Sequence, residues 1–149
     1  MLEKKVADLL VDQVNKELYS AYLYMDFANY YADEGLDGFR NWYEVQAKEE
    51  RDHALMIRTY LIDNGVRVTF DAIAKPDKTF KTHMDPLVAG LEHERYVTSL
   101  ITAIYNAASD AKDYKTMQFL DWFVKEQGEE EKNAADLITR YELFGSDSK

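Results

Sequence analysis

The chain has 149 residues, a formal net charge of −10 and no cysteine. This length suits one domain with its own hydrophobic core, and the lack of cysteine excludes disulfides, thiolate zinc sites and cysteine-ligated iron–sulfur clusters. The acidic balance argues against a nucleic-acid partner, because phosphate contacts require a basic patch. Since there is no apolar run of about 18 residues and no signal-type start, we expect no membrane segment and a cytoplasmic location.

The distribution of helix formers and helix breakers predicts an all-α fold. The 2 prolines and 6 glycines are few, and good helix formers are plentiful. Four amphipathic helices are predicted in a single domain, 1–149, over about 3–31, 37–63, 86–109 and 113–144. Gly35 is expected to end the first helix in a left-handed conformation, and Asn64-Gly65 to end the second. Asp85 is expected to cap the third helix, with Pro86 at its first position. Gly145 is expected to end the fourth, before a short polar tail, 146–149.

The segment between the second and third helices, Val66 to Met84, is unusually long. A loop of about 20 residues without secondary structure is uncommon in a compact domain unless it has a structural role. A crossover along the helices supplies that role, since about 20 extended residues can span the roughly 40 Å length of such helices. We therefore predict a four-helix bundle made of two hairpins that one long crossover joins.

Each predicted helix has one face on which residues recur three and four positions apart, and a bundle buries such a face. The face of the first helix comprises Val6, Leu10, Gln13, Glu17, Ser20, Tyr24, Phe27 and Tyr31. The face of the third comprises Leu87, Leu91, Glu94, Thr98, Ile101 and Tyr105. Acidic residues interrupt all four faces: Glu17, Glu50, Glu94 and Glu130. Burying an unpaired carboxylate costs several kcal/mol, and a cation that gathers the carboxylates removes that cost. The four faces therefore predict a metal site.

Counting from the turns places these acidic residues at matching levels. Glu17 lies about 17 residues before the first turn and Glu50 about 15 after it, so both lie roughly 25 Å from that turn. Glu94 and Glu130 have similar separations from the turn between the third and fourth helices. Each hairpin is thus expected to bring its carboxylates together.

The motif Glu50-x-x-His53 is a weak signal by itself, because many helices carry Glu and His three residues apart. Its position in a buried face at the level of Glu17 strengthens it. On the fourth helix Gln127 and Glu130 lie in the buried face, whereas Glu131 is expected to be solvated. A second acidic cluster, beside this face, is expected from Glu49, Glu126, Glu129 and Glu130.

Two further residues near these clusters have more than one reading. Tyr24 lies two turns from Glu17, where packing is the ordinary role of an aromatic side chain. A phenol beside a redox metal can also donate a hydrogen bond or an electron. Gly128 costs roughly 1 kcal/mol in the middle of a helix. We expect it to relieve crowding or to permit a local bend.

At these residues the chain closely resembles the bacterial and archaeal non-haem ferritins, over essentially its whole length. The matching stretches are Asn15–Tyr24, Glu49–Ala54, Val68–Ile73 and Glu126–Lys132. The resemblance implies a ferritin-like bundle and oxidation of Fe(II) by dioxygen or hydrogen peroxide. It also implies storage of ferric mineral in a homo-oligomeric shell of 24 subunits.

The resemblance also implies a role for each candidate residue. Glu17, Glu50 and His53 would hold one iron. Glu50 would bridge to a second iron that Glu94 and Glu130 hold, with Gln127 alongside. The third iron site of the bacterial members would comprise Glu49, Glu126, Glu129 and Glu130. Tyr24 matches the tyrosine beside the family's di-iron centre.

The chain departs from the family pattern in two places. Relatives usually continue into a short fifth helix, whereas this sequence stops at Lys149, so that helix is expected to be either absent by nature or truncated. Haem is not expected, because Asp52 and Gln127-x-x-Glu130 replace a methionine and a second Glu-x-x-His of the haem-binding relatives.

Two alternative functions remain open. A rubrerythrin-like peroxidase is disfavoured by the lack of cysteine, and a storage or structural bundle without catalysis is disfavoured by the complete ligand set.

Overall fold

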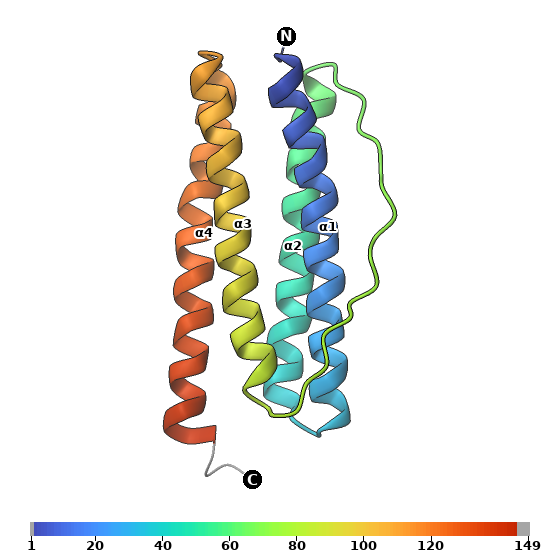
Figure 1. The fold of residues 1–149 in the computed structure, drawn as a ribbon, viewed down its shortest axis with the longest axis vertical. Coiled ribbons are helices and arrows are strands. Elements are labelled where there is room, and N and C mark those ends of the chain that lie inside the picture. Colours follow the sequence, from blue (N-terminus) through green and yellow to red (C-terminus); the bar gives the residue numbers. More distant parts are fainter. Residues whose placement is uncertain (1, 146–149) are drawn as a thin grey trace. The chain divides into compact units, whose positions relative to one another are not determined.

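The computed structural model describes residues 2–145, so the predicted polar tail, 146–149, lies outside the described residues. The regular structure is helical and comprises α1 (Lys4–Asp33), α2 (Asp37–Asp63), α3 (Asp85–Asp110), α4 (Tyr114–Arg140) and the short π-helix η1 (Tyr141–Gly145) (Figure 1). The chain divides into two compact units, Met1–Thr79 and Phe80–Lys149. The all-α prediction is confirmed.

The first unit is a hairpin of α1 and α2, and glycines end both helices. Gly35 has a φ of +72° and Gly65 a φ of +75°. Just beyond each glycine, a backbone N–H donates to a carbonyl five residues earlier, from Leu36 to Tyr31 and from Val66 to Leu61, at 2.9 Å in both cases. This pattern satisfies carbonyl groups at a helix end, and the left-handed residue that it needs is normally glycine. The two predicted stops are therefore confirmed.

The predicted face of α1 is buried at every one of its positions. Near the turn it contributes to an aromatic cluster in which Tyr43 of α2 meets three rings of α1. The ring centroids of Tyr24, Phe27 and Tyr31 lie 5.6, 5.2 and 5.9 Å from that of Tyr43. Aromatic contacts at these separations add to the gain from burying the rings. The cluster holds the register of α1 against α2, on which the level of Glu17 and Glu50 depends.

The segment between α2 and α3 returns along the hairpin in extended form, as the crossover prediction requires (Figure 1). The side chain of Asn15 on α1 holds this segment by two hydrogen bonds. Asn15 Nδ2 donates to the carbonyl of Thr69 at 3.0 Å, and the amide of Asp71 donates to Asn15 Oδ1 at 2.8 Å. One side-chain amide thus satisfies two backbone groups of a segment that has no ladder of its own.

The second unit is a hairpin of α3 and α4, which a tight turn joins. Lys112 occupies the left-handed position with a φ of 54°, and the amide of Asp113 donates to the carbonyl of Ala108 at 2.8 Å. Asp113 then caps α4. Its Oδ1 accepts a hydrogen bond from the backbone amide of Thr116 at 3.1 Å, and its Oδ2 accepts one from the Thr116 hydroxyl at 2.6 Å. A side-chain acceptor at this position satisfies an N–H group that the helix leaves open.

Asp85 does not cap α3 as expected. It is the first residue of the helix, and its carboxylate accepts hydrogen bonds from the preceding turn. The donors are the amide of Lys81 at 2.8 Å, the amide of Thr82 at 3.0 Å and the hydroxyl of Thr82 at 2.9 Å. These bonds lower the pKa of Asp85, since they favour its charged form. Pro86, expected at the first position of the helix, is its second residue.

The buried face of α3 differs from the predicted one by a rotation. Leu87, Glu94 and Ile101 are buried as expected. The expected flank of Leu91, Thr98 and Tyr105 is only half-buried. The opposite flank is buried instead, and it comprises Gly90, Val97 and Ile104. Both flanks keep the spacing of three and four residues, so periodicity does not distinguish them.

The fourth helix also ends differently from the prediction. It was expected to remain α-helical to residue 144, but α4 ends at Arg140 and residues 141–145 form one π-helical turn. A π-turn continues the helix with bonds one residue longer, and five residues are too few for a hydrophobic period to separate the two forms.

Candidate metal centre

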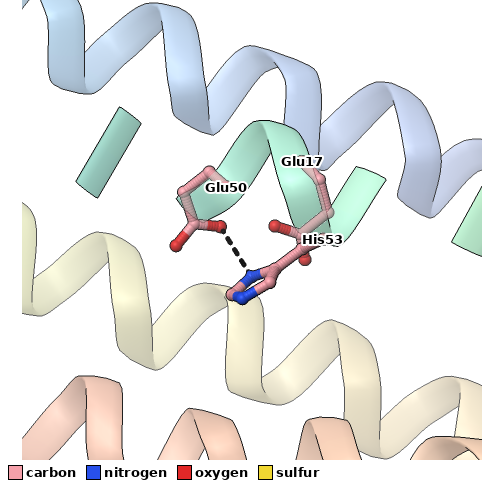
Figure 2. Close-up of side chains that lie close together, drawn as sticks. All are labelled: Glu17, Glu50 and His53. Atoms are coloured by element: carbon pink, nitrogen blue, oxygen red, sulfur yellow. Dashed lines mark ion pairs between the residues drawn. The ribbon is translucent and has the colours of Figure 1, made fainter. Parts of the chain in front are cut away.

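Three buried side chains converge inside the α1–α2 hairpin. Glu17 comes from α1, while Glu50 and His53 lie one turn apart on α2, and their exposed fractions are 1%, 0% and 4%. Each offers a ligand atom, and these atoms all lie within 4.8 Å of one another. Figure 2 shows the contact between His53 Nδ1 and Glu50 Oε2, which is 3.5 Å long. The structure thus brings together the residues that the sequence placed at one level.

Glu17 is in an environment that resists negative charge. Burial raises its pKa well above the ordinary value, and the charge of the nearby Glu50 carboxyl group raises it further. The neighbouring His53 and a hydrogen bond from Gln13 act in the opposite direction. Two carboxyl groups buried close together disfavour each other's negative charge, and a cation between them would remove that cost.

Gln13 is a residue of this site to which the sequence analysis assigned no role. It lies one turn before Glu17 on the same buried face, and its Nε2 donates to Glu17 Oε1 at 3.0 Å. An amide four residues before a buried glutamate, on the face that the bundle covers, is the sequence signal that indicates it. Gln13 orients the carboxylate from the side opposite the turn.

Tyr24 is buried in α1 and packs within the aromatic cluster, against Phe27 and Tyr43. The packing role that is ordinary for such a side chain is therefore present. It lies on the same buried face as Glu17, two turns away. Its role beside a metal centre stays a prediction.

The α3–α4 hairpin carries a second set of buried polar side chains: Glu94, Gln127 and Glu130. Gln127 joins the two helices, because its Nε2 donates to the backbone carbonyl of Glu94 and to the hydroxyl of Thr98, at 3.2 Å in both cases. The Thr98 hydroxyl donates in turn to Glu131 Oε2 at 2.6 Å. The expectation that Glu131 is simply solvated is wrong: it is half-buried and bound to the neighbouring helix.

The remaining acidic candidates lie nearer to solvent. Glu126 is half-buried and Glu129 is exposed on α4, and Glu49 is half-buried on α2. Gly128 lies between Glu126 and Glu129 on α4 at an exposed position, where an added Cβ would meet nothing within 4 Å. The expectation that this glycine relieves crowding is therefore wrong within the described residues.

The candidate metal ligands of the two hairpins are carboxylates, the imidazole of His53 and the amide of Gln127. Oxygen-rich sets with a single nitrogen suit hard cations and hold iron with positions open to an oxidant. Within the described helices, none has the combination of length and hydropathy that a membrane span requires.

The chain is similar to known proteins over nearly its whole length. The ferritin-like domain family matches residues 7–144. The bacterial non-heme ferritin of Campylobacter jejuni is 35% identical over 145 residues, which cover 97% of this chain and 87% of that protein. The bacterial non-heme ferritin of Staphylococcus saprophyticus is 38% identical over 148 residues, which cover 99% of this chain and 89% of that protein.

Solved ferritin structures are similar to this chain in fold. A humanized archaeal ferritin superposes with a TM-score of 0.96 at 37% identity, covering 99% of this chain and 91% of that one. The Chlorobium tepidum ferritin has a TM-score of 0.94 at 32% identity, covering 97% of this chain and 88% of that one. This chain belongs to the ferritin family and has the all-α four-helix bundle fold of that family.

Proposed function

We propose that this chain stores iron and oxidises Fe(II) at a di-iron carboxylate centre, as a ferroxidase. The ferritin family and the fold support iron storage. The observation that carries the catalytic part is the convergence of Glu17, Glu50 and His53 inside one hairpin, where the pKa of Glu17 is raised. A group of carboxylates that is costly to bury without a cation is a site prepared to take one.

The first iron would bind to Glu17, Glu50 and His53. A proton held by Glu17, whose pKa is raised, would pass to solvent when Fe(II) binds, since the cation replaces the proton as the stabilising charge. Gln13 holds the Glu17 carboxylate through Oε1. The site therefore needs little rearrangement to accept the ion.

The second iron would bind to Glu94 and Glu130, with Gln127 alongside and Glu50 as the bridging ligand. The burial of these three residues in the α3–α4 hairpin supports this assignment. A third iron site would use the acidic residues nearer to solvent, Glu49, Glu126 and Glu129, together with Glu130. Tyr24 would donate a hydrogen bond or an electron at the centre.

The proposed reaction takes one electron from each of two Fe(II) ions. With dioxygen as the oxidant, two Fe(II), one O2 and two protons give two Fe(III) and one H2O2. With peroxide, two Fe(II), one H2O2 and two protons give two Fe(III) and two waters. The Fe(III) product would be stored as mineral inside a homo-oligomeric shell of 24 copies in the cytoplasm.

Rapid mixing of the metal-free protein with Fe(II) and oxygen tests the proposal. We expect fast oxidation by the parent protein and its loss in Glu50→Ala and His53→Ala, because each removes a ligand of the first iron. Asp52→Ala is the matched control, since Asp52 lies between them on α2 but is exposed. Circular dichroism checks that all variants keep their helices.

Electron microscopy of the oxidation product tests storage separately. Electron-dense mineral inside particles supports it, whereas free ferric precipitate contradicts it. Oxidation at the parental rate by either ligand variant would show that the centre lies elsewhere. If the parent protein shows no fast oxidation phase, the ferroxidase proposal is contradicted and a bundle without catalysis is favoured.

A further inference from the structure

The amide of Gln127 is held in one orientation by its neighbours on α3. Its Nε2 lies 3.2 Å from the carbonyl oxygen of Glu94 and 3.2 Å from the hydroxyl oxygen of Thr98. A backbone carbonyl only accepts hydrogen bonds, so the group that faces it must be the NH2 end of the amide. The two bonds that the Gln127 side chain makes within the described residues therefore both use the nitrogen.

Glu131 determines what the Thr98 hydroxyl can offer to Gln127. The hydroxyl has a single hydrogen and two acceptors in reach, Glu131 Oε2 at 2.6 Å and the Glu94 carbonyl at 3.0 Å. The shorter contact is to a carboxylate, and hydrogen bonds to charged acceptors are the stronger ones. The hydrogen therefore points to Glu131, and the oxygen lone pairs are left to accept from Gln127 Nε2.

A flipped amide would be disfavoured at both contacts. Its oxygen would face the Glu94 carbonyl and the lone pairs of the Thr98 hydroxyl, which would place acceptor against acceptor twice. With the observed orientation, Oε1 is the atom of Gln127 that remains available as a ligand. The contacts that produce this preference all lie within α3 and α4.

We propose that Thr98 and Glu131 are positioning residues of the ferroxidase centre, which hold the Gln127 amide so that its Oε1 serves the iron bound by Glu94 and Glu130. This inference rests on the proposed ferroxidase function. Neither residue touches the iron in this account. Groups that orient a metal ligand typically contribute 10- to 100-fold to metal affinity, so we expect an effect of about tenfold.

The test measures Fe(II) binding without oxygen, by equilibrium dialysis or titration calorimetry, in the full chain. Thr98→Val removes the hydroxyl but keeps the shape of the side chain, and Thr98→Ser restores the hydroxyl. Thr102→Val is the matched control, because Thr102 is exposed one turn later on α3. Glu131→Leu tests the same network from α4 if Thr98→Val folds poorly.

We expect two tight Fe(II) sites per chain in the parent. Thr98→Val should weaken one of them about tenfold and leave the other, at Glu17, Glu50 and His53, unchanged. Thr98→Ser and Thr102→Val should bind like the parent. The fast oxidation phase of Thr98→Val should need a correspondingly higher Fe(II) concentration for half-saturation.

The outcomes separate this inference from the proposed function. If the parent binds and oxidises Fe(II) but Thr98→Val and Glu131→Leu behave like it, the positioning role is overturned and the ferroxidase remains. An equal loss at both sites together with a lower melting temperature would also overturn it, since that pattern indicates a structural role only. A parent protein that binds no Fe(II) would overturn both.

Discussion

The carboxyl groups of Glu17 on α1 and Glu50 on α2 lie close together in the buried interior of one hairpin, where burial and the charge of Glu50 raise the pKa of Glu17. His53 lies against the same pair, with Nδ1 3.5 Å from Glu50 Oε2. Two acids and one imidazole buried together are costly as a purely structural element but suit a cation site. The predictions on metal and pH follow from this relationship.

The metal-free protein should lose stability as the pH rises because of Glu17. A folded-state pKa above the ordinary value of 4.5 means that the folded state holds a proton which the unfolded chain releases. The stabilisation is therefore complete below about 4.5 and is lost as the pH rises through the folded-state pKa. Chemical unfolding of parent and Glu17→Gln across pH 4–8, with a chelator present, measures the difference.

Glu17→Gln should show a flatter pH dependence than the parent in that window. The variant should be at least as stable as the parent near neutral pH, because it removes the cost of a buried charge while keeping a group that can accept from Gln13. A steeper slope in the variant would mean that another group sets the pH dependence.

Zinc should stabilise the protein through the same cluster. Zn(II) does not undergo the redox reaction, and a ligand that binds only the folded state adds about 2.7 kcal/mol at a hundredfold excess over Kd. The melting temperature of the parent should therefore rise with Zn(II), and that of Glu50→Ala should rise much less. Asp52→Ala, in which an exposed acid is removed from α2, should respond like the parent.

Glu126→Ala and Glu129→Ala should change the iron-to-oxygen stoichiometry more than the rate of the first fast phase. Both residues are less buried than Glu130, and their proposed role is in a third iron site rather than in the di-iron pair. Oxygen-electrode titration with increasing Fe(II) gives the stoichiometry. An unchanged ratio with normal turnover would identify these two acids as part of a solvated surface.

Gly128→Ala should stabilise α4 by up to about 1 kcal/mol, the difference in helix propensity between the two residues. The added Cβ meets nothing within 4 Å, and the position is exposed. Gly35→Ala is the matched control, and it should destabilise the protein. Its Cβ also meets nothing, but a φ of +72° places a non-glycine residue under strain of about 1 kcal/mol.

Denaturant unfolding of both glycine variants gives the comparison. Destabilisation by Gly128→Ala would contradict the open environment of this position on α4. Neither substitution removes a proposed ligand, so the fast oxidation phase should keep the parental rate in both.

Much of the fold and part of the site follow from local rules that the sequence carries by itself. Helical periodicity and Gly35 determine where the first hairpin turns, and Gly65 determines where its second helix ends, because glycine readily adopts the left-handed conformation that ends a helix. The fixed rise of a helix then determines that Glu17 and Glu50 meet, since both lie the same distance from that turn. The Glu50-x-x-His53 spacing needs no tertiary information either.

Only the tertiary structure decided which contacts form across helices. Two flanks of α3 have the same spacing, and packing buries that of Val97 and Ile104 while Thr98 stays half-buried. That rotation brings the Thr98 hydroxyl to Glu131 and Gln127, and so makes a hydrogen-bonded residue of an acid that the sequence assigned to solvent. Asn15 likewise finds Thr69 and Asp71 only once the crossover lies along α1. Hydrogen bonds between distant segments depend on how closely those segments approach, and residue spacing along one helix does not contain that distance.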